Sequence, residues 1–136
     1  MDNQVTNNSN KNKKILVVED EQYLRDLYVE LLTEEGYTVD FAEDGQIGYQ
    51  KILDNIYDLV LLDLIMPRMP GISLLRKLEE ENYAQKQKQK IVILTNLGQD
   101  SIIAEAIALG VRGYIIKSDV TPDKILTEVK YYLDQP

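Results

Sequence analysis

The sequence predicts an α/β protein in which helices cover both faces of a parallel sheet. Short continuous apolar runs alternate five times with stretches whose apolar residues recur at helical spacing. The run at residues 15–18 lacks the polar alternation of a half-exposed strand, which indicates a strand that is buried on both faces. The length of 136 residues fits one domain with an adequate core. We therefore expect a repeated strand–helix unit with right-handed crossovers.

Three strands and two helices are expected in the first half of the chain. Gly36 is expected to end the first helix, and Asp44 to cap the start of the second. The strands are expected at residues 15–18, 37–41 and 59–62. The expected apolar faces are Leu24, Leu27, Tyr28, Leu31 and Leu32 for the first helix, and Ile47, Ile52 and Leu53 for the second.

Two strands and three helices are expected in the second half. A helix follows Pro70 and Gly71, Gly110 ends the next helix, and Thr121 with Pro122 marks the start of the last. The strands are expected at residues 91–94 and 113–116. The expected apolar faces are Ile72, Leu75 and Leu78, then Ile102, Ile103, Ala106, Ile107 and Leu109, then Ile125, Val129, Tyr132 and Leu133.

Two stretches are expected to be irregular. Residues 1–13 are polar and rich in Asn, and such a stretch buries too little apolar surface to offset its ordering entropy. They are therefore expected to form a disordered tail, with the domain itself at residues 14–134. Gln85–Lys90 alternates Gln and Lys and is expected to be a solvated loop.

The composition excludes several kinds of function. The chain has no Cys and no His, which excludes disulfide scaffolds, histidine catalysis and thiolate or imidazole metal sites. A metal must then be bound by oxygen, which favours Mg²⁺ or Ca²⁺. The net charge of −8 argues against direct contact with nucleic acid. No apolar run is long enough to span a membrane or to serve as a secretory signal, so a cytoplasmic chain without a membrane partner is expected.

Polar residues follow four of the five predicted strands. Glu19 and Asp20 follow the first strand, Asp63 the third, Thr95 the fourth and Lys117 the fifth. In a parallel sheet these strand ends meet at one rim, where ligands of open α/β sheets bind. Three carboxylates at one rim would repel one another unless a cation lay among them, and Mg²⁺ fits oxygen ligands of this kind.

The other two side chains at this rim suit a phosphoryl group. Lys117 supplies a positive charge and Thr95 a hydroxyl, and phosphoryl transfer depends mostly on positioning and charge neutralisation. The chain contains neither GxxxxGK[ST] nor GxGxxG, so a nucleotide is not the expected ligand. The remaining nucleophile is an aspartate, which can form an acyl phosphate.

The same strand ends carry a family resemblance. The stretches ILVVEDE (residues 15–21), LVLLDLIMPRMPG (59–71), VILTN (92–96) and GYIIK (113–117) resemble those of the receiver domain of two-component response regulators, CheY-like single-domain regulators among them. The resemblance covers about residues 13–133. It implies a flavodoxin-like, doubly wound (βα)5 fold with strand order 2-1-3-4-5.

The resemblance also implies a role for each rim residue. Asp63 matches the phosphoacceptor. Mg²⁺ would be bound by Glu19, acting through water, by Asp20, by Asp63 and by the backbone carbonyl of Ile65. Lys117 would pair with the phosphoryl oxygens.

The resemblance implies a switch and its partners as well. Thr95 matches the switch hydroxyl and Tyr114 the switch aromatic. Asn96 differs from the family residue at its position, and it would either narrow access to the phosphoryl site or offer the phosphoryl group a further polar contact. The phosphoryl donor would be a histidine kinase or a phosphotransfer protein, since this chain has no His. Phosphorylation would change the face formed by residues 102–109, 113–116 and 125–133. That face would bind an effector protein or an output domain, or form a phosphorylation-dependent homodimer.

The chain departs from the family at a few positions. Ser118 stands where the family usually has a proline after the lysine, which leaves the geometry of this peptide bond open. Asn96 replaces a usually small residue, and Glu19 replaces a second aspartate, which is a common variant. A receiver of this kind is not an enzyme in the ordinary sense, although it assists its own phosphotransfer and dephosphorylation.

Other interpretations remain open at this point. Ser118 and Asn96 are compatible with a pseudo-receiver, a protein-binding module that never uses phosphate. An aspartyl-phosphate hydrolase of the haloacid-dehalogenase kind would need a second aspartate where this chain has Ile65. The chain is compatible both with a stand-alone receiver and with a part of a longer regulator.

Overall fold

Five strands form a single parallel sheet. The computed structural model describes residues 12–81, 89–96 and 98–136. The strand order is β2-β1-β3-β4-β5, and each neighbouring pair is parallel. The strands are β1 (Lys14–Val18), β2 (Thr38–Ala42), β3 (Leu59–Asp63), β4 (Lys90–Thr95) and β5 (Gly113–Ile116). The order confirms the flavodoxin-like α/β fold expected from the sequence.

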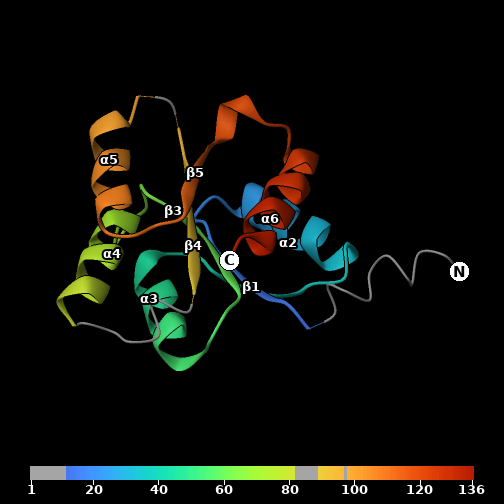
Figure 1. Ribbon diagram of the computed structural model, residues 1–136, viewed down its shortest axis with the longest axis horizontal. Coiled ribbons are helices and arrows are strands. Elements are labelled where there is room, and N and C mark those ends of the chain that lie inside the picture. Colours follow the sequence, from blue (N-terminus) through green and yellow to red (C-terminus); the bar gives the residue numbers. More distant parts are fainter. Residues whose placement is uncertain (1–11, 82–88, 97) are drawn as a thin grey trace, which may run out of the picture.

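Helices connect the strands and cover both faces of the sheet. Within the described residues these helices are α2 (Gln22–Glu34), α3 (Gly45–Asp54), α4 (Gly71–Glu80), α5 (Asp100–Ala108) and α6 (Ile125–Asp134). Figure 1 shows α2 and α6 on one side of the sheet and α3, α4 and α5 on the other. Two short 3-10 turns, η2 (Lys117–Asp119) and η3 (Pro122–Lys124), lie between β5 and α6.

The strands contribute side chains to a separate core on each face. In β1, Leu16 and Val18 pack with α3 and α4, whereas Ile15 and Val17 pack with α2 and α6. All four are fully buried. Two-sided burial of this kind explains why the inner strands β1, β3 and β4 are rich in apolar residues, since neither of their faces is left to water. Each such side chain contributes about 2 kcal/mol of burial free energy.

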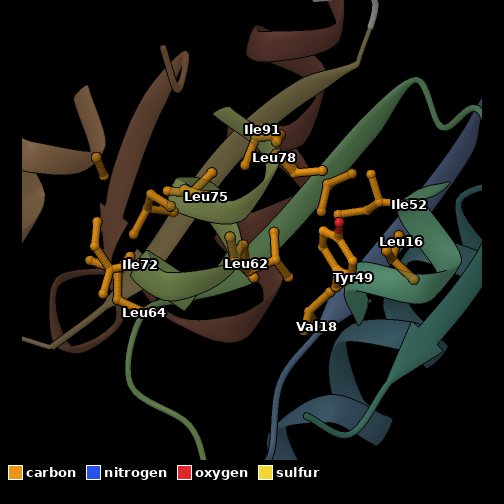
Figure 2. Close-up of a cluster of buried hydrophobic side chains, with 14 of the residues drawn as sticks. Leu16, Val18, Tyr49, Ile52, Leu62, Leu64, Ile72, Leu75, Leu78 and Ile91 are labelled. Carbon is orange, nitrogen blue, oxygen red and sulfur yellow. The ribbon is translucent and has the colours of Figure 1, made fainter. Parts of the chain in front are cut away.

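The larger core lies under α3, α4 and α5. Figure 2 shows Val18 and Leu62 of the sheet packed against Tyr49 and Ile52 of α3 and Leu75 of α4. The Tyr49 hydroxyl donates a hydrogen bond to the carboxylate of Glu81, just beyond the last turn of α4. This polar contact joins α3 to α4 above their shared apolar face.

Most of the predicted signals lie at helix ends, and the last of them begins a 3-10 turn instead. Asp44 caps α3, since its Oδ1 accepts a hydrogen bond from the Ile47 N–H at 2.9 Å. Gly36 and Gly110 follow α2 and α5 with φ of 108° and 100°, a left-handed conformation that favours glycine. Thr121 and Pro122 begin a 3-10 turn, and α6 itself starts three residues later, at Ile125.

Two predicted core residues are instead exposed. Ile47 is 37% exposed and Ile107 is 50% exposed. A Cβ at Gly48 would lie 2.9 Å from Val18 Cγ1, so α3 approaches the sheet at Gly48 and turns Ile47 outward. The helix α5 packs through Ile103 and Ala106, and its next residue, Ile107, therefore points away.

The predicted irregular stretches are only partly described. Residues 1–11 and 85–88 lie outside the described residues, so the predicted tail remains a prediction. The last two residues of Gln85–Lys90 contradict a solvated loop, because Gln89 is buried and Lys90 begins β4. The Gln89 side-chain oxygen accepts a hydrogen bond from the Tyr57 N–H at 3.2 Å, which explains its burial. No helix in the described part of the chain has the length and apolar character needed to cross a membrane.

Candidate functional site

Three carboxylates meet where β1 and β3 end. One carboxylate oxygen each of Glu19, Asp20 and Asp63 lies within 4.8 Å of the others. Glu19 continues the β1 ladder, because its N–H donates a hydrogen bond to the Ala42 carbonyl at 3.1 Å. Glu19 and Asp63 are buried, whereas Asp20 is exposed. The parallel sheet thus brings together the acidic residues that the sequence predicted at this rim.

Lys117 reaches the same cluster from the end of β5. Its Nζ lies 2.7 Å from Glu19 Oε1 and 3.1 Å from Asp63 Oδ2. The lysine side chain is itself mostly buried. One ammonium is therefore shared between two buried carboxylates, and it balances only part of their combined negative charge.

Backbone amides fix the other oxygen of each buried carboxylate. Glu19 Oε2 accepts a hydrogen bond from the Glu21 N–H at 3.1 Å, and Asp63 Oδ1 accepts one from the Ile65 N–H at 3.2 Å. Each carboxylate is thus held by an amide on one side and by Lys117 on the other. This arrangement fixes both groups before any ligand binds.

The environment shifts the proton affinities of Asp63 and Lys117. Burial, together with the charge of Glu19, raises the pKa of Asp63 to about 7, against the opposing effect of Lys117. Burial alone would lower the pKa of Lys117, but its contact with Glu19 and the charge of Asp63 outweigh burial and raise that pKa. The cluster thus holds more negative charge than one lysine can balance.

The donors in this cluster fit a hard divalent cation. They are carboxylate oxygens, the ligands that Mg²⁺ prefers. Glu19 Oε1 is buried and, within the described part of the chain, accepts no hydrogen bond, although it forms the ion pair with Lys117. Asp20 leaves its carboxylate open to solvent. An acidic cluster of this kind is typical of a Mg²⁺ site.

The remaining predicted residues lie near the rim in different environments. Thr95 is fully buried, and its hydroxyl donates a long 3.4 Å hydrogen bond to the Asn96 carbonyl. Asn96 and Ile65 are exposed. Tyr114 is 46% exposed and, with Ile103, lines a hollow of about 440 Å³ between α5 and β5.

The loop after β5 takes a regular form without the family proline. Lys117 to Asp119 form the turn η2, and every described peptide bond is trans, including the bond between Lys117 and Ser118. The chain therefore orients the lysine toward the cluster with a serine at this position.

Two arginines near the rim make contacts that sequence reasoning did not predict. Arg25 of α2 is buried beneath the loop that holds Glu19 and Asp20. Its spacing to the buried residues Tyr28 and Leu32 is helical, and that spacing was the available signal. Arg68 has a φ of 64°, and its Nε donates a hydrogen bond to Asp44 Oδ2 at 2.7 Å, linking the loop after β3 to the start of α3.

Comparisons with known proteins agree with this fold and rim. The model of the response regulator receiver domain matches residues 15–130. The chain is 37% identical over 120 residues to the transcriptional regulatory protein ResD of Bacillus subtilis, covering 88% of this chain and 48% of ResD. It is 36% identical over 107 residues to the chemotaxis protein CheY of Treponema pallidum, covering 76% of this chain and 72% of CheY.

Solved structures give the same result. A CheY-like receiver domain from Methanospirillum hungatei superposes with a TM-score of 0.80 at 30% identity, covering 90% of this chain and 94% of the other. The response regulator TrrA from Thermotoga maritima, solved in complex with Mg²⁺-BeF, gives 0.73 at 34% identity, covering 88% and 97% of the two chains.

The chain belongs to the response regulator receiver domain family. Members of this family are phosphoacceptor signalling domains of two-component systems rather than ordinary enzymes, and the curated relatives include regulators. The chain spans about half the length of the first curated relatives that it matches.

Proposed function

We propose that this domain, at residues 14–134, is a phosphorylation-controlled switch in which Asp63 accepts a phosphoryl group. The observation that carries the proposal is the convergence of Asp63 with Glu19, Asp20 and Lys117 at one rim. The boundaries follow the start of β1 and the end of α6. The proposed Mg²⁺ ligands are the carboxylates of Glu19, Asp20 and Asp63 and the backbone carbonyl of Ile65.

The proposed reaction transfers a phosphoryl group to a carboxylate oxygen of Asp63. An O–P bond forms at Asp63 while the N–P bond of a donor phosphohistidine breaks, and the imidazole takes up a proton. The donor is a histidine kinase or a phosphotransfer protein, because this chain contains no His. Bound Mg²⁺ would supply charge neutralisation for the phosphoryl oxygens. Lys117, already 3.1 Å from Asp63 Oδ2, balances the charge that arrives.

The proposed output is a change of packing on the face formed by α5, β5 and α6. Thr95 would bond the phosphoryl group, and the exposed side chain of Asn96 would contact it from the rim. Tyr114 would then turn into the space beside Ile103, away from solvent. The phosphoryl group thereby shifts the balance between two packings of one face, which binds an effector protein, an output domain or a second copy of the chain.

Phosphate-affinity gel electrophoresis after incubation with acetyl phosphate and Mg²⁺ tests the phosphoacceptor. We expect the wild type to give a retarded band and Asp63→Asn to give none. Asp58→Asn is the matched control, because Asp58 lies at the opposite end of β3 and its Oδ2 accepts a hydrogen bond from the Lys14 N–H at 2.7 Å. A band shift that persists in Asp63→Asn would rule out Asp63.

The alternative function is a binding module that does not use phosphate. Two observations favour it: Ser118 replaces the family proline, and Lys117 already pairs with Glu19 and Asp63 without a ligand. The absence of a band shift in the wild type, together with the absence of Mg²⁺-dependent NMR shifts at the rim, would support this alternative.

A further inference from the structure

Arg25 is a buried cation that forms no ion pair with any described carboxylate. Its residue is 8% exposed, and no ion pair of Arg25 is found among the residues that the structure describes. It lies in the first turns of α2, where the helix dipole disfavours a positive charge. Burying a guanidinium without an ion pair, near the N-terminus of a helix, costs free energy. The contacts that Arg25 makes therefore need an explanation.

The contacts of Arg25 are concentrated on the acidic loop. Its Nη1 donates hydrogen bonds to the carbonyl of Glu19 at 3.0 Å and to the carbonyl of Asp20 at 3.3 Å. Its guanidinium lies 5.7 Å from the centre of the Phe41 ring. Its Nε is buried and has no hydrogen-bond partner within the described residues. The arginine therefore reaches back over the start of its own helix to hold two successive peptide groups.

These two peptide groups flank a single Cα atom. The Glu19 carbonyl belongs to the peptide plane before the Cα of Asp20, and the Asp20 carbonyl belongs to the plane after it. A residue has only two soft backbone angles, so fixing both planes fixes the direction of its Cα–Cβ bond. Asp20 is the exposed member of the carboxylate cluster, and no hydrogen bond or ion pair from the described residues orients its side chain.

We infer that Arg25 is a positioning residue that sets the direction of the Asp20 carboxylate, and with it the affinity of the rim for a divalent cation. The inference rests on the proposed function, since it concerns the proposed Mg²⁺ ligands. Partners that orient metal ligands typically change metal affinity by about 10–100-fold when they are removed.

A calorimetric Mg²⁺ titration of the Arg25→Gln protein distinguishes two effects of Arg25 on Mg²⁺ affinity. One is its positive charge, and the other is its positioning of Asp20. Removal of a nearby cation should by itself tighten Mg²⁺ binding, because the acidic cluster becomes more negative. Loss of positioning predicts the opposite sign, a roughly tenfold weaker affinity. Arg112→Gln is the charge-matched control at the other end of the sheet, before β5, and should bind Mg²⁺ as the wild type does. Arg25→Gln binding as tightly as the wild type, or more tightly, would overturn the inference.

An NMR comparison and a second variant test the role of Arg25 further. In metal-free protein, the amide NMR signals of Asp20 and Glu21 should move in Arg25→Gln but not in the control Arg112→Gln. Unchanged signals in Arg25→Gln would contradict the inference. If Arg25→Gln does not fold, Arg25→Lys carries the test. The shorter ammonium reaches one carbonyl rather than two, so weaker Mg²⁺ binding is expected, and wild-type affinity would count against positioning.

A failure of the inference differs from a failure of the proposed function. If the wild type does not bind Mg²⁺, the proposed site itself is wrong. If the wild type binds Mg²⁺, Asp20→Asn loses that binding and Arg25→Gln retains it, then only the role of Arg25 is wrong.

Discussion

Asp63 lies between two opposing electrostatic influences. Burial and the neighbouring Glu19 favour its neutral form, whereas the ammonium of Lys117 favours its ionised form. The net result raises the pKa of Asp63 to about 7. An ionised Asp63 therefore costs folding free energy in the absence of a cation, and a bound divalent cation would relieve that cost. The carboxylates at the rim therefore lower the stability of the folded protein as long as no divalent cation is bound.

The first prediction concerns Asp63→Asn in Mg²⁺-free buffer. The pKa of Asp63 rises from 3.8 to about 7 on folding, so between these values the folded protein keeps a proton that the unfolded chain has lost. This group therefore lowers wild-type stability as the pH rises through that window. Asparagine cannot ionise, so its stability gain over the wild type should be about 2 kcal/mol larger near pH 8 than near pH 5. Urea unfolding at the two pH values measures the difference, and a gain that shrinks toward pH 8 would contradict the raised pKa.

The second prediction concerns Lys117→Met. Loss of the ammonium leaves buried Glu19 and Asp63 without their cation, which should lower the free energy of unfolding by about 3 kcal/mol. Mg²⁺ at millimolar concentration should restore more stability to this variant than to the wild type, because the cation takes over the neutralising role. Urea unfolding with and without Mg²⁺ measures both effects. Exposed Lys124→Met is the control, and equal Mg²⁺ stabilisation of the wild type and Lys117→Met would count against a shared pocket.

The strand-end residues could be predicted from the sequence because parallel strands place their carboxyl ends together. That rule locates Glu19, Asp63 and Lys117 without any side-chain detail. Arg25 could not be found in this way, because its role depends on a side chain that folds back onto the backbone of its own loop. Sequence spacing shows only that Arg25 shares a helix face with Tyr28.

At the scale of the elements, the end of α6 is tied to the start of β4. Lys90 Nζ donates hydrogen bonds to the carbonyls of Tyr132 and Leu133, each at 3.0 Å, and to the carbonyl of Gln135. These carbonyls lie at the C-terminal end of α6, where few backbone N–H groups are available to them, and a cation there also complements the helix dipole. Burial lowers the pKa of Lys90, and the positive charge of Arg112 lowers it further. The alternation of Gln and Lys in residues 85–90 predicted a solvated loop. It could not show that Lys90 contacts the end of α6, because that helix end lies far away in the sequence.

The third prediction concerns Lys90→Met. Loss of the cap should lower the free energy of unfolding by about 1 kcal/mol, since three carbonyl contacts and a favourable dipole interaction disappear. Amide hydrogen exchange should accelerate in the last turn of α6. Lys130→Met is the matched control, because Lys130 is exposed and only 3.6 Å from Asp134 in a surface pair of little value. Equal effects of the two substitutions on α6 would contradict the capping role of Lys90.

At the scale of the whole molecule, the fold was predictable because the three inner strands, β1, β3 and β4, are buried on both faces. Continuous apolar runs and helical spacing identify the alternating elements, and right-handed crossovers limit the topology. The orientation of single helices was less predictable. Close approach at Gly48 turns Ile47 outward, and this depends on a contact with Val18 that lies on another element. Periodicity identifies a helix face but not its rotation against the sheet.

The fourth prediction concerns communication from the rim to the face around Tyr114. The chain has no Trp, so Tyr114→Trp creates a single fluorescent reporter at a position that is 46% exposed. Acetyl phosphate with Mg²⁺ should shift its emission to the blue and reduce quenching by acrylamide, because the ring moves out of water. Thr95→Ala in the same background should remove the response. An equal fluorescence response in the Thr95→Ala variant would show that position 114 does not respond through the proposed switch.

The most direct measurement of the central claim is chemical identification of the phosphorylated residue. Borohydride reduces an aspartyl phosphate to homoserine, which marks the modified position for tandem mass spectrometry. After treatment with acetyl phosphate and Mg²⁺, we expect homoserine at position 63 and its loss when Mg²⁺ is omitted. Homoserine at Asp20 or elsewhere, or none at position 63 under conditions that phosphorylate the protein, would contradict the account.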